Sequence, residues 1–255
     1  MLRSSALLLI ALVACASPAS AASDGAPFPP SRQTLTVDGI ARSFAVRAPA
    51  AYDGRRAAPV VFAFHPFGMN AEYMATRVPL ARSWRQAIVV YPNGSGQPQS
   101  WQTTTGERGD RDLHFFDAML SWVREHACVD AHGVYAVGYS NGAGFAYLLA
   151  CERAASIAGL GIASGRLECK PSQPAPVVIN HGTADGTIPY DAALDAATTW
   201  AAVNGCKAPP PPVPEGCAVA RSCSFAPVTL CTYAGGHEYN SSFTATAVDF
   251  LKGRR

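Results

Sequence analysis

Three side chains with the chemistry needed for nucleophilic catalysis lie far apart in this chain of 255 residues. Ser140 is the centre of Gly138-Tyr-Ser-Asn-Gly142, which follows an apolar run typical of a strand and precedes a helical pattern. A sharp turn from strand to helix strains its middle residue, and the flanking glycines remove β-carbons that would collide with neighbouring backbone. The serine hydroxyl is then held near the positive end of a helix, where an oxyanion can be stabilised. The alternative interpretation is a glycine-rich turn that only packs a helix close to a strand.

A serine hydroxyl needs a base, and the base needs a carboxylate that orients it. Asp185 follows the apolar run 176–180, and His237 follows the run 228–233 within Gly235-Gly-His237. The order serine, acid, histidine, each on a loop after a later strand, is that of the α/β-hydrolases. We therefore expect Asp185 to be the acid and His237 the base. A turn-capping aspartate and a surface-loop histidine are the alternatives.

Two backbone amides are expected to form an oxyanion hole. One is the amide of Asn141, the residue after the serine. The other comes from the loop His65-Pro-Phe-Gly68, which follows the apolar run 59–64. Pro66 has no amide proton, so Phe67 is the expected donor and Gly68 the second choice.

Aromatic residues near the expected mouth of the site could hold an aromatic acyl group. Trp101 and Tyr139 are the predicted substrate contacts, and packing in the core or at the rim is the alternative for each. His181, four residues before Asp185, is expected to buttress the acid loop by hydrogen bonding.

These loops need a scaffold of alternating strands and helices. β-like runs predict an antiparallel pair of strands at 34–37 and 43–47, and further strands are predicted at 59–64, 87–91, 133–138, 157–163, 176–180 and 228–233. Helical patterns cover 70–85 with an interruption near Pro79, then 113–126, 142–152, 192–203 and 241–252. Asp38-Gly39 predicts a hairpin turn between the first two strands. The alternation predicts an α/β fold with a mostly parallel central sheet, helices on both faces and the chemistry at the carboxyl ends of strands.

The first 21 residues are predicted to be a secretory signal peptide. Arg3 precedes an apolar run at 6–16, which is too short to span a bilayer, and Ala19-Ser-Ala21 offers a cleavage site. A competing interpretation is a bacterial lipobox, Leu12-Val-Ala-Cys15, which would anchor the protein by a lipid at Cys15. Residues 22–32 are expected to be a flexible tether, and 33–255 one catalytic domain. The protein is expected to be secreted or periplasmic.

Seven further cysteines predict disulfides in an oxidising compartment, with zinc binding as the weaker alternative. Because seven is odd, one thiol is expected to be free or to pair with another chain. Four cysteines fall in 206–231, around the proline run 209–212, where neither a helix nor an inner strand is expected. We expect a surface loop with two bridges there, one of them Cys206–Cys223.

The composition excludes several classes of protein. A chain with 49% hydrophobic and 15% charged residues is globular rather than disordered. A net charge of +2 does not favour nucleic-acid binding, which needs a concentrated basic surface. No stretch is long and apolar enough for a membrane span. We expect a monomer whose partner is a small-molecule or oligosaccharide ester.

The motifs resemble a known family. The serine, aspartate and histidine loops, with Tyr91-Pro-Asn-Gly94 and Cys128-Val-Asp130, are similar to those of the secreted feruloyl esterase and poly(3-hydroxybutyrate) depolymerase family of α/β-hydrolases. The resemblance covers about 34–250. Type C and D feruloyl esterases are most similar, on Ala63-Phe-His65, on Trp101 downstream of the Tyr91 motif, and on Asn204-Gly-Cys206 with Ser222-Cys223.

The resemblance implies a specific activity. Carried onto this chain, it implies a Ser140, Asp185 and His237 triad, an oxyanion hole from Phe67 and Asn141, and hydrolysis of aromatic or short acyl esters without a cofactor. Feruloyl esters of plant polysaccharide are the expected substrates, with poly(3-hydroxybutyrate) and acetylated xylan as alternatives. A hypothesis from another class is a binding lipoprotein with a vestigial hydrolase fold. The loop departs from many relatives in reading His-Pro-Phe-Gly instead of His-Gly, and Cys217 and Cys231 lie outside the pattern.

Overall fold

The computed structural model describes residues 32–253. The predicted signal peptide at 1–21, the alternative lipid anchor at Cys15 and the expected tether up to residue 31 lie outside the described residues. The first strand begins at Arg32, which the sequence assigns to the end of the tether.

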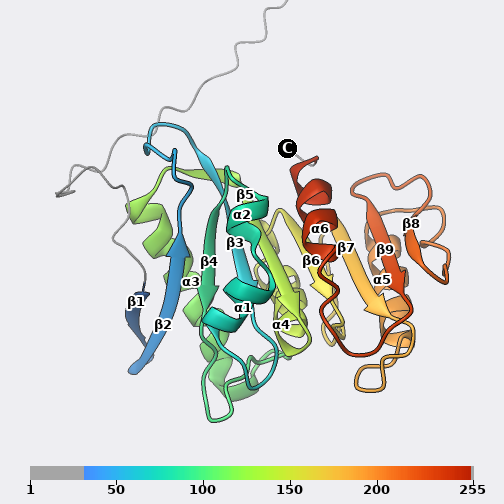
Figure 1. Ribbon diagram of the computed structural model, residues 1–255, viewed down its shortest axis with the longest axis horizontal. Helices are drawn as coiled ribbons and strands as arrows, with labels where there is room; N and C mark the ends of the chain where they lie inside the picture. Colours follow the sequence, from blue (N-terminus) through green and yellow to red (C-terminus); the bar gives the residue numbers. More distant parts are fainter. Residues whose placement is uncertain (1–31, 254–255) are drawn as a thin grey trace, which may run out of the picture.

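A nine-stranded sheet forms the centre of the molecule (Figure 1). Its strands, in the spatial order β1-β2-β4-β3-β5-β6-β7-β9-β8, are β1 (Arg32–Val37), β2 (Ile40–Arg47), β4 (Ile88–Pro92), β3 (Ala58–Phe64), β5 (Val129–Tyr139), β6 (Gly159–Ala163), β7 (Val177–Gly182), β9 (Val228–Tyr233) and β8 (Gly216–Val219). The six strands from β4 to β9 run parallel, and β1, β2 and β8 pair antiparallel at the two edges. The expected hairpin joins β1 to β2, with positive φ at Asp38 and Gly39.

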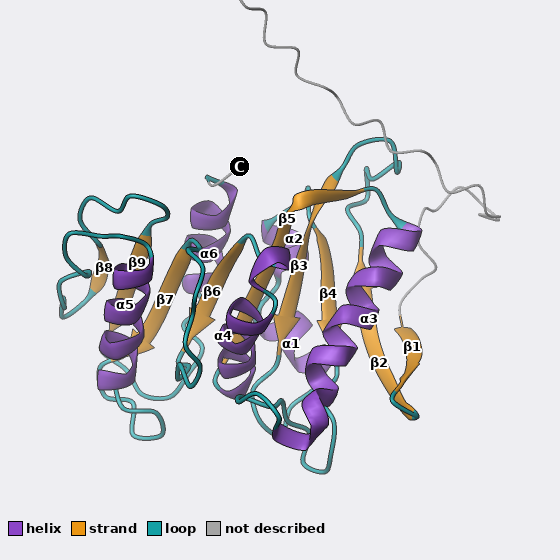
Figure 2. Ribbon diagram, turned by 180° about the vertical axis from the view of Figure 1, so that it is seen from behind, coloured by secondary structure: helices purple, strands orange, loops and turns teal. Residues whose placement is uncertain are grey.

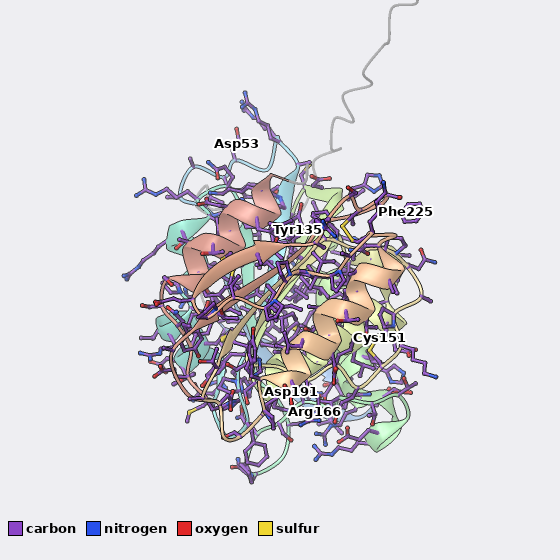
Figure 3. The ribbon with its side chains drawn as sticks, turned by 90° about the vertical axis from the view of Figure 1, so that its right-hand side faces the viewer. Asp53, Tyr135, Cys151, Arg166, Asp191 and Phe225 are labelled. Carbon is purple, nitrogen blue, oxygen red and sulfur yellow. A yellow bond between two sulfur atoms is a disulfide. The ribbon has the colours of Figure 1, made fainter. Side chains whose placement is uncertain are left out.

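Helices cover both faces of this sheet (Figure 2). One face carries α1 (Ala71–Arg77), α2 (Leu80–Ser83) and α6 (Phe243–Lys252), and the other carries α3 (Arg111–His126), α4 (Asn141–Glu152) and α5 (Asp191–Val203). Short 3₁₀ helices, η1 (Glu107–Asp110) and η2 (Ala154–Ser156), precede α3 and follow α4. Figure 3 shows the resulting layers, with the sheet between α6 and α5. Over the described residues, each helix is too short or too polar to cross a lipid bilayer.

The parallel strands are apolar along their whole length because both of their faces are covered. In β3, Val60, Phe62 and Phe64 belong to the core under α3 and α4, whereas Val61 and Ala63 pack under α1 and α6. The predicted α/β-hydrolase architecture is therefore confirmed, and so is the helix interruption near Pro79, where α1 ends and α2 begins.

The segment 206–231 differs from the sequence-based expectation. Besides the proline run it contains β8, a short edge strand that was expected to be loop. Cys217 and Cys231 face each other in the β8–β9 pair and form a disulfide. The predicted Cys206–Cys223 bridge is confirmed, and a further bridge joins Cys151 and Cys169. The described part of the chain contains no free cysteine, so the expectation of an unpaired thiol is not met there.

Candidate active site

Ser140 lies at the turn between β5 and α4, at the carboxyl edge of the sheet. Its backbone has φ 54° and ψ −121°, a left-handed φ that is costly for a residue with a side chain. A Cβ at Gly138 would collide with the carbonyl of Gly142, and one at Gly142 would collide with the carbonyl of Phe64. The two glycines thus allow a turn tight enough to hold the hydroxyl in this strained position.

The structure brings Ser140, His237 and Asp185 together. His237 Nε2 lies 2.7 Å from Ser140 Oγ, and His237 Nδ1 lies 2.7 Å from Asp185 Oδ2. The Asp185 side chain has no exposed surface, whereas the His237 side chain is 18% exposed. The hydroxyl therefore contacts an imidazole that solvent can reach, and the imidazole contacts a buried carboxylate.

Asp185 is held as a hydrogen-bond acceptor. Its Oδ1 accepts from the amides of Thr187 and Ile188, each at 2.9 Å, while Oδ2 faces His237. Burial acts to raise the pKa of Asp185, but the hydrogen bonds from His237, Ile188 and Thr187 outweigh it and keep this pKa below the ordinary value. The carboxylate can therefore fix the Nδ1–H tautomer of His237, which leaves Nε2 able to accept a proton from Ser140.

His181 supports the same carboxylate, as predicted. Its fully buried ring places Nε2 2.8 Å from the carbonyl of Ile188 and 3.2 Å from Asp185 Oδ2. Burial lowers the pKa of His181, so the ring is neutral near pH 7 and Nε2 carries its proton toward both oxygens.

Tyrosine hydroxyls fix the loop that carries His237. Tyr139 donates to the carbonyl of His237 at 3.0 Å, and Tyr233 lies 3.1 Å from the carbonyl of Gly236 and 2.7 Å from that of Glu238. Tyr139 is only 6% exposed and packs in the core under α1 and α6. Its position does not support the predicted substrate contact, since its hydroxyl is engaged in holding the histidine loop.

The backbone amides of Phe67 and Asn141 are open donors, meaning N–H groups that are free to bind an oxyanion. Asn141 begins α4, so its N–H has no partner within the helix, and neither amide donates to another described group. The amide of Gly68, the second choice, donates to the carbonyl of Gln99 at 2.8 Å. Of the two loop residues, Phe67 is therefore the one whose amide remains available, and the residue is 58% exposed.

Trp101 is 2% exposed and lies in the core, which does not support the predicted contact between its ring and a substrate. Its ring stacks on Phe145, and its Nε1 donates to the carbonyl of His65 at 3.0 Å. Its backbone pairs with the side chain of Asn141 through bonds of 2.8 and 3.0 Å. Trp101 thus joins the two segments that carry the open amides.

The buried side chain of His65 stabilises the loop that carries Phe67. Its Nε2 accepts from the amide of Gly94 at 2.8 Å, which leaves Nδ1 to donate to the carbonyl of Pro66 at 2.8 Å. Burial lowers the pKa of His65 to about 4, although the bond to Pro66 acts in the opposite direction. The ring is therefore a neutral structural element near pH 7.

A buried polar network next to Trp101 has no signal in the sequence. Asp112, with no exposed surface, pairs with Arg42 at 2.8 Å and accepts from the amide of Gln102 at 2.8 Å, and its own amide donates to the Gln102 side chain at 3.0 Å. These bonds fix the loop around Trp101 to the start of α3. Across residues 32–253, no group of three or more His, Cys, Asp or Glu side chains is placed to hold a metal ion.

The chain is similar to feruloyl esterases over most of its length. The chain is 31% identical to a feruloyl esterase C of Emericella nidulans over 213 residues, which cover 77% of this chain and 76% of that protein. It is 28% identical to a feruloyl esterase D of Neurospora crassa over 221 residues, which cover 79% of this chain and 74% of that protein. No protein-family model matches the chain.

Solved structures share the fold at lower identity. An acetyl xylan esterase of Aspergillus awamori superposes with a TM-score of 0.69 at 15% identity, over 86% of this chain and 99% of that chain. A ferulic acid esterase of Anaeromyces mucronatus in complex with ferulic acid gives 0.62 at 15% identity, over 94% and 96%. The chain belongs to the family of the type C and D feruloyl esterases and is a carboxylic-ester hydrolase with the α/β-hydrolase fold.

Proposed function

We propose that Ser140, His237 and Asp185 are the catalytic triad of a serine esterase, and that the amides of Phe67 and Asn141 form its oxyanion hole. The observation that carries the proposal is the pair of 2.7 Å contacts that link the three side chains in series. Such a relay converts a weakly nucleophilic hydroxyl into one that can attack an ester.

The reaction proceeds by acyl transfer. His237 Nε2 takes the proton of Ser140 as Oγ attacks the ester carbonyl carbon, and the developing oxyanion accepts from the two open amides. The tetrahedral intermediate collapses as His237 returns this proton to the leaving alcohol oxygen. Water then attacks the acyl-enzyme with the same residues, which releases the acid and restores Ser140. Asp185 stabilises the imidazolium in both halves of the cycle.

The proposed substrates are feruloyl esters of plant polysaccharide. The relatives named feruloyl esterase C and D support this class. Two apolar residues of the loop after β3, Phe67 and Met69, are 58% and 42% exposed and offer a surface against which a planar aromatic acyl group can pack. The alternatives are acetylated xylan and hydroxybutyrate oligomers.

Export suits this function, and three disulfides persist best in an oxidising compartment. Secretion after cleavage at Ala21 is the proposed route. The N-terminal mass of the mature protein tests it, because lipidation at Cys15 would retain that cysteine with an added diacylglycerol.

Two measurements test the activity. A fluorophosphonate probe is expected to label the wild type at Ser140 and to leave Ser140→Ala unlabelled, with the exposed Ser241→Ala as the control. Hydrolysis of methyl ferulate is expected to fall on the order of 10⁴–10⁶-fold in Ser140→Ala. Normal activity of Ser140→Ala would refute the triad, and hydrolysis of acetylated xylan or hydroxybutyrate oligomers without methyl ferulate would refute the acyl preference.

A further inference from the structure

A groove of about 660 Å³ lies on the face of the sheet that carries α1 and α2. In Figure 1 these two helices lie in front of β3 and β4, whereas β1 and β2 have no described helix in front of them. The groove occupies this uncovered region between β2 and the helices. Its lining includes none of Ser140, Asp185, His237 and Phe67, so it is separate from the proposed catalytic residues.

Small side chains create the space. Phe44 and Val46 of β2 point to the opposite face and pack under α3, which leaves Ala45 and Arg47 on the groove side. The lining contains five alanines, namely Ala45, Ala48, Ala71, Ala75 and Ala81. The groove is therefore wide at its floor, and the longer side chains at its rim supply the groups that could bind a ligand.

Three arginines from separate elements stand at that rim. Arg32 of β1, Arg47 of β2 and Arg82 of α2 are all exposed, and none forms an ion pair with another described residue. Arg32 donates one bond to Ser43, and Arg47 one to the carbonyl of Val46. A guanidinium has five N–H donors, so most remain available. Glu72 is the single acidic residue of the lining.

The groove also runs toward the catalytic edge. Its lining includes Asn70, three residues after Phe67, and Asn93, next to the Gly94 that bonds His65. At its other end Arg47 lies opposite Val89, at the start of β4. A chain-like ligand lying in the groove would thus extend from the loop that bears Phe67 along the strands to Arg47.

We propose that this groove binds carboxylate groups of an acidic polysaccharide, such as a xylan that bears uronate side groups. Separated guanidinium groups suit carboxylates spaced along a polymer, because each can accept a pair of N–H donors. An open polar groove leaves room for hydrated sugars. That the bound polymer also carries the feruloyl ester rests on the proposed function. The binding of uronate groups in the groove does not depend on it. Binding in the groove would lengthen the time that the acidic polymer spends beside the catalytic residues.

Binding of soluble glucuronoxylan and of neutral arabinoxylan, measured by affinity electrophoresis or calorimetry, tests the proposal. The wild type is expected to prefer glucuronoxylan. The double variant Arg47→Gln, Arg82→Gln is expected to bind it at least about fivefold more weakly, with methyl ferulate hydrolysis unchanged within about twofold. The matched control is Arg124→Gln, Arg221→Gln, which removes the same charge from exposed residues outside the groove and is expected to bind like the wild type.

Three results would overturn the groove proposal: equal affinity for the acidic and neutral polymers, an equal loss in the control variant, or a preference for dextran sulfate over glucuronoxylan, which would indicate a site for any polyanion. The wild-type protein separates this proposal from the proposed function. Wild-type protein that binds glucuronoxylan but does not hydrolyse methyl ferulate would leave the groove proposal standing and refute the proposed feruloyl esterase function.

Discussion

The side chain of Asn141 and the backbone of Trp101 form a reciprocal pair, in which Asn141 Oδ1 accepts from the Trp101 amide at 2.8 Å and Nδ2 donates to the Trp101 carbonyl at 3.0 Å. Trp101 Nε1 in turn donates to the carbonyl of His65. One buried residue therefore connects the turn after β5 to the loop after β3. The spacing of the two open amides, at Phe67 and Asn141, depends on this connection.

The pair predicts a specific kinetic defect for Asn141→Ala. This variant keeps the backbone amide of residue 141 but loses both bonds to Trp101. We expect kcat for methyl ferulate to fall about 10- to 100-fold with KM little changed, since an oxyanion donor acts on the transition state. Trp101→Phe, which loses only the bond to His65, is expected to show a smaller fall in kcat. A change confined to KM would show that the pair does not position the oxyanion donors.

Asp185→Asn is expected to lower kcat/KM on the order of 10²–10⁴-fold. Its amide nitrogen would face His237 Nδ1 as a donor, which favours the tautomer with the proton on Nε2, and that tautomer cannot accept a proton from Ser140. The matched control is Asp191→Asn, an exposed carboxylate at the start of α5. Its activity is expected within about twofold of the wild type. Equal losses in both variants would reject Asp185 as the acid.

Gly142→Ala tests the tight turn at Ser140. The new methyl group would press on the backbone carbonyls of Phe64 and His65, neither of which is the end of a flexible side chain. We expect a loss of at least about 2 kcal/mol in the free energy of unfolding by urea, together with reduced activity. Gly186→Ala, where a Cβ meets nothing within 4 Å, is the control and is expected to change stability by less than about 0.5 kcal/mol. Equal stability of the two variants would contradict this packing.

The scaffold could be predicted because its signals are local. The run 59–64 is apolar throughout, as a strand covered on both faces must be, and the run 228–233 is rich in β-branched and aromatic residues; the structure places β3 and β9 there. Ser140, Asp185 and His237 follow β5, β7 and β9, so their place at the carboxyl edge of the sheet could be predicted from the strands before them. The sequence does not predict the edge strand β8 because its four residues, Gly216–Val219, are too few to show a pattern and follow a proline-rich loop.

The supporting residues could not be predicted in the same way. Trp101 and Tyr139 were expected at the mouth of the site because of their place in the chain, but their rings are buried by helices distant in sequence. The Arg42–Asp112 pair joins residues 70 positions apart in the core. Charged residues have no sequence pattern that announces such burial, which depends on the partner that the fold supplies.

His65 makes the stability of the fold depend on pH. Burial lowers its pKa to about 4 in the folded protein, from an ordinary value of 6.5. Between these values the unfolded chain binds the proton and the folded chain does not, so protonation favours unfolding. The contribution of neutral His65 is fully present above pH 6.5 and is lost as the pH falls toward 4, by up to about 3 kcal/mol.

The variant His65→Gln isolates this effect, because a glutamine oxygen can accept the Gly94 amide but does not titrate. At pH 7.5 we expect the variant to be less stable, since it loses the bond to Pro66. The difference in unfolding free energy is expected to shrink by about 2 kcal/mol or more between pH 7 and pH 4.5. Urea titrations followed by tryptophan fluorescence at several pH values measure it. The control is His132→Gln, at an exposed position. If the unfolding free energies of the wild type and of His65→Gln change in parallel with pH, the buried imidazole does not resist protonation.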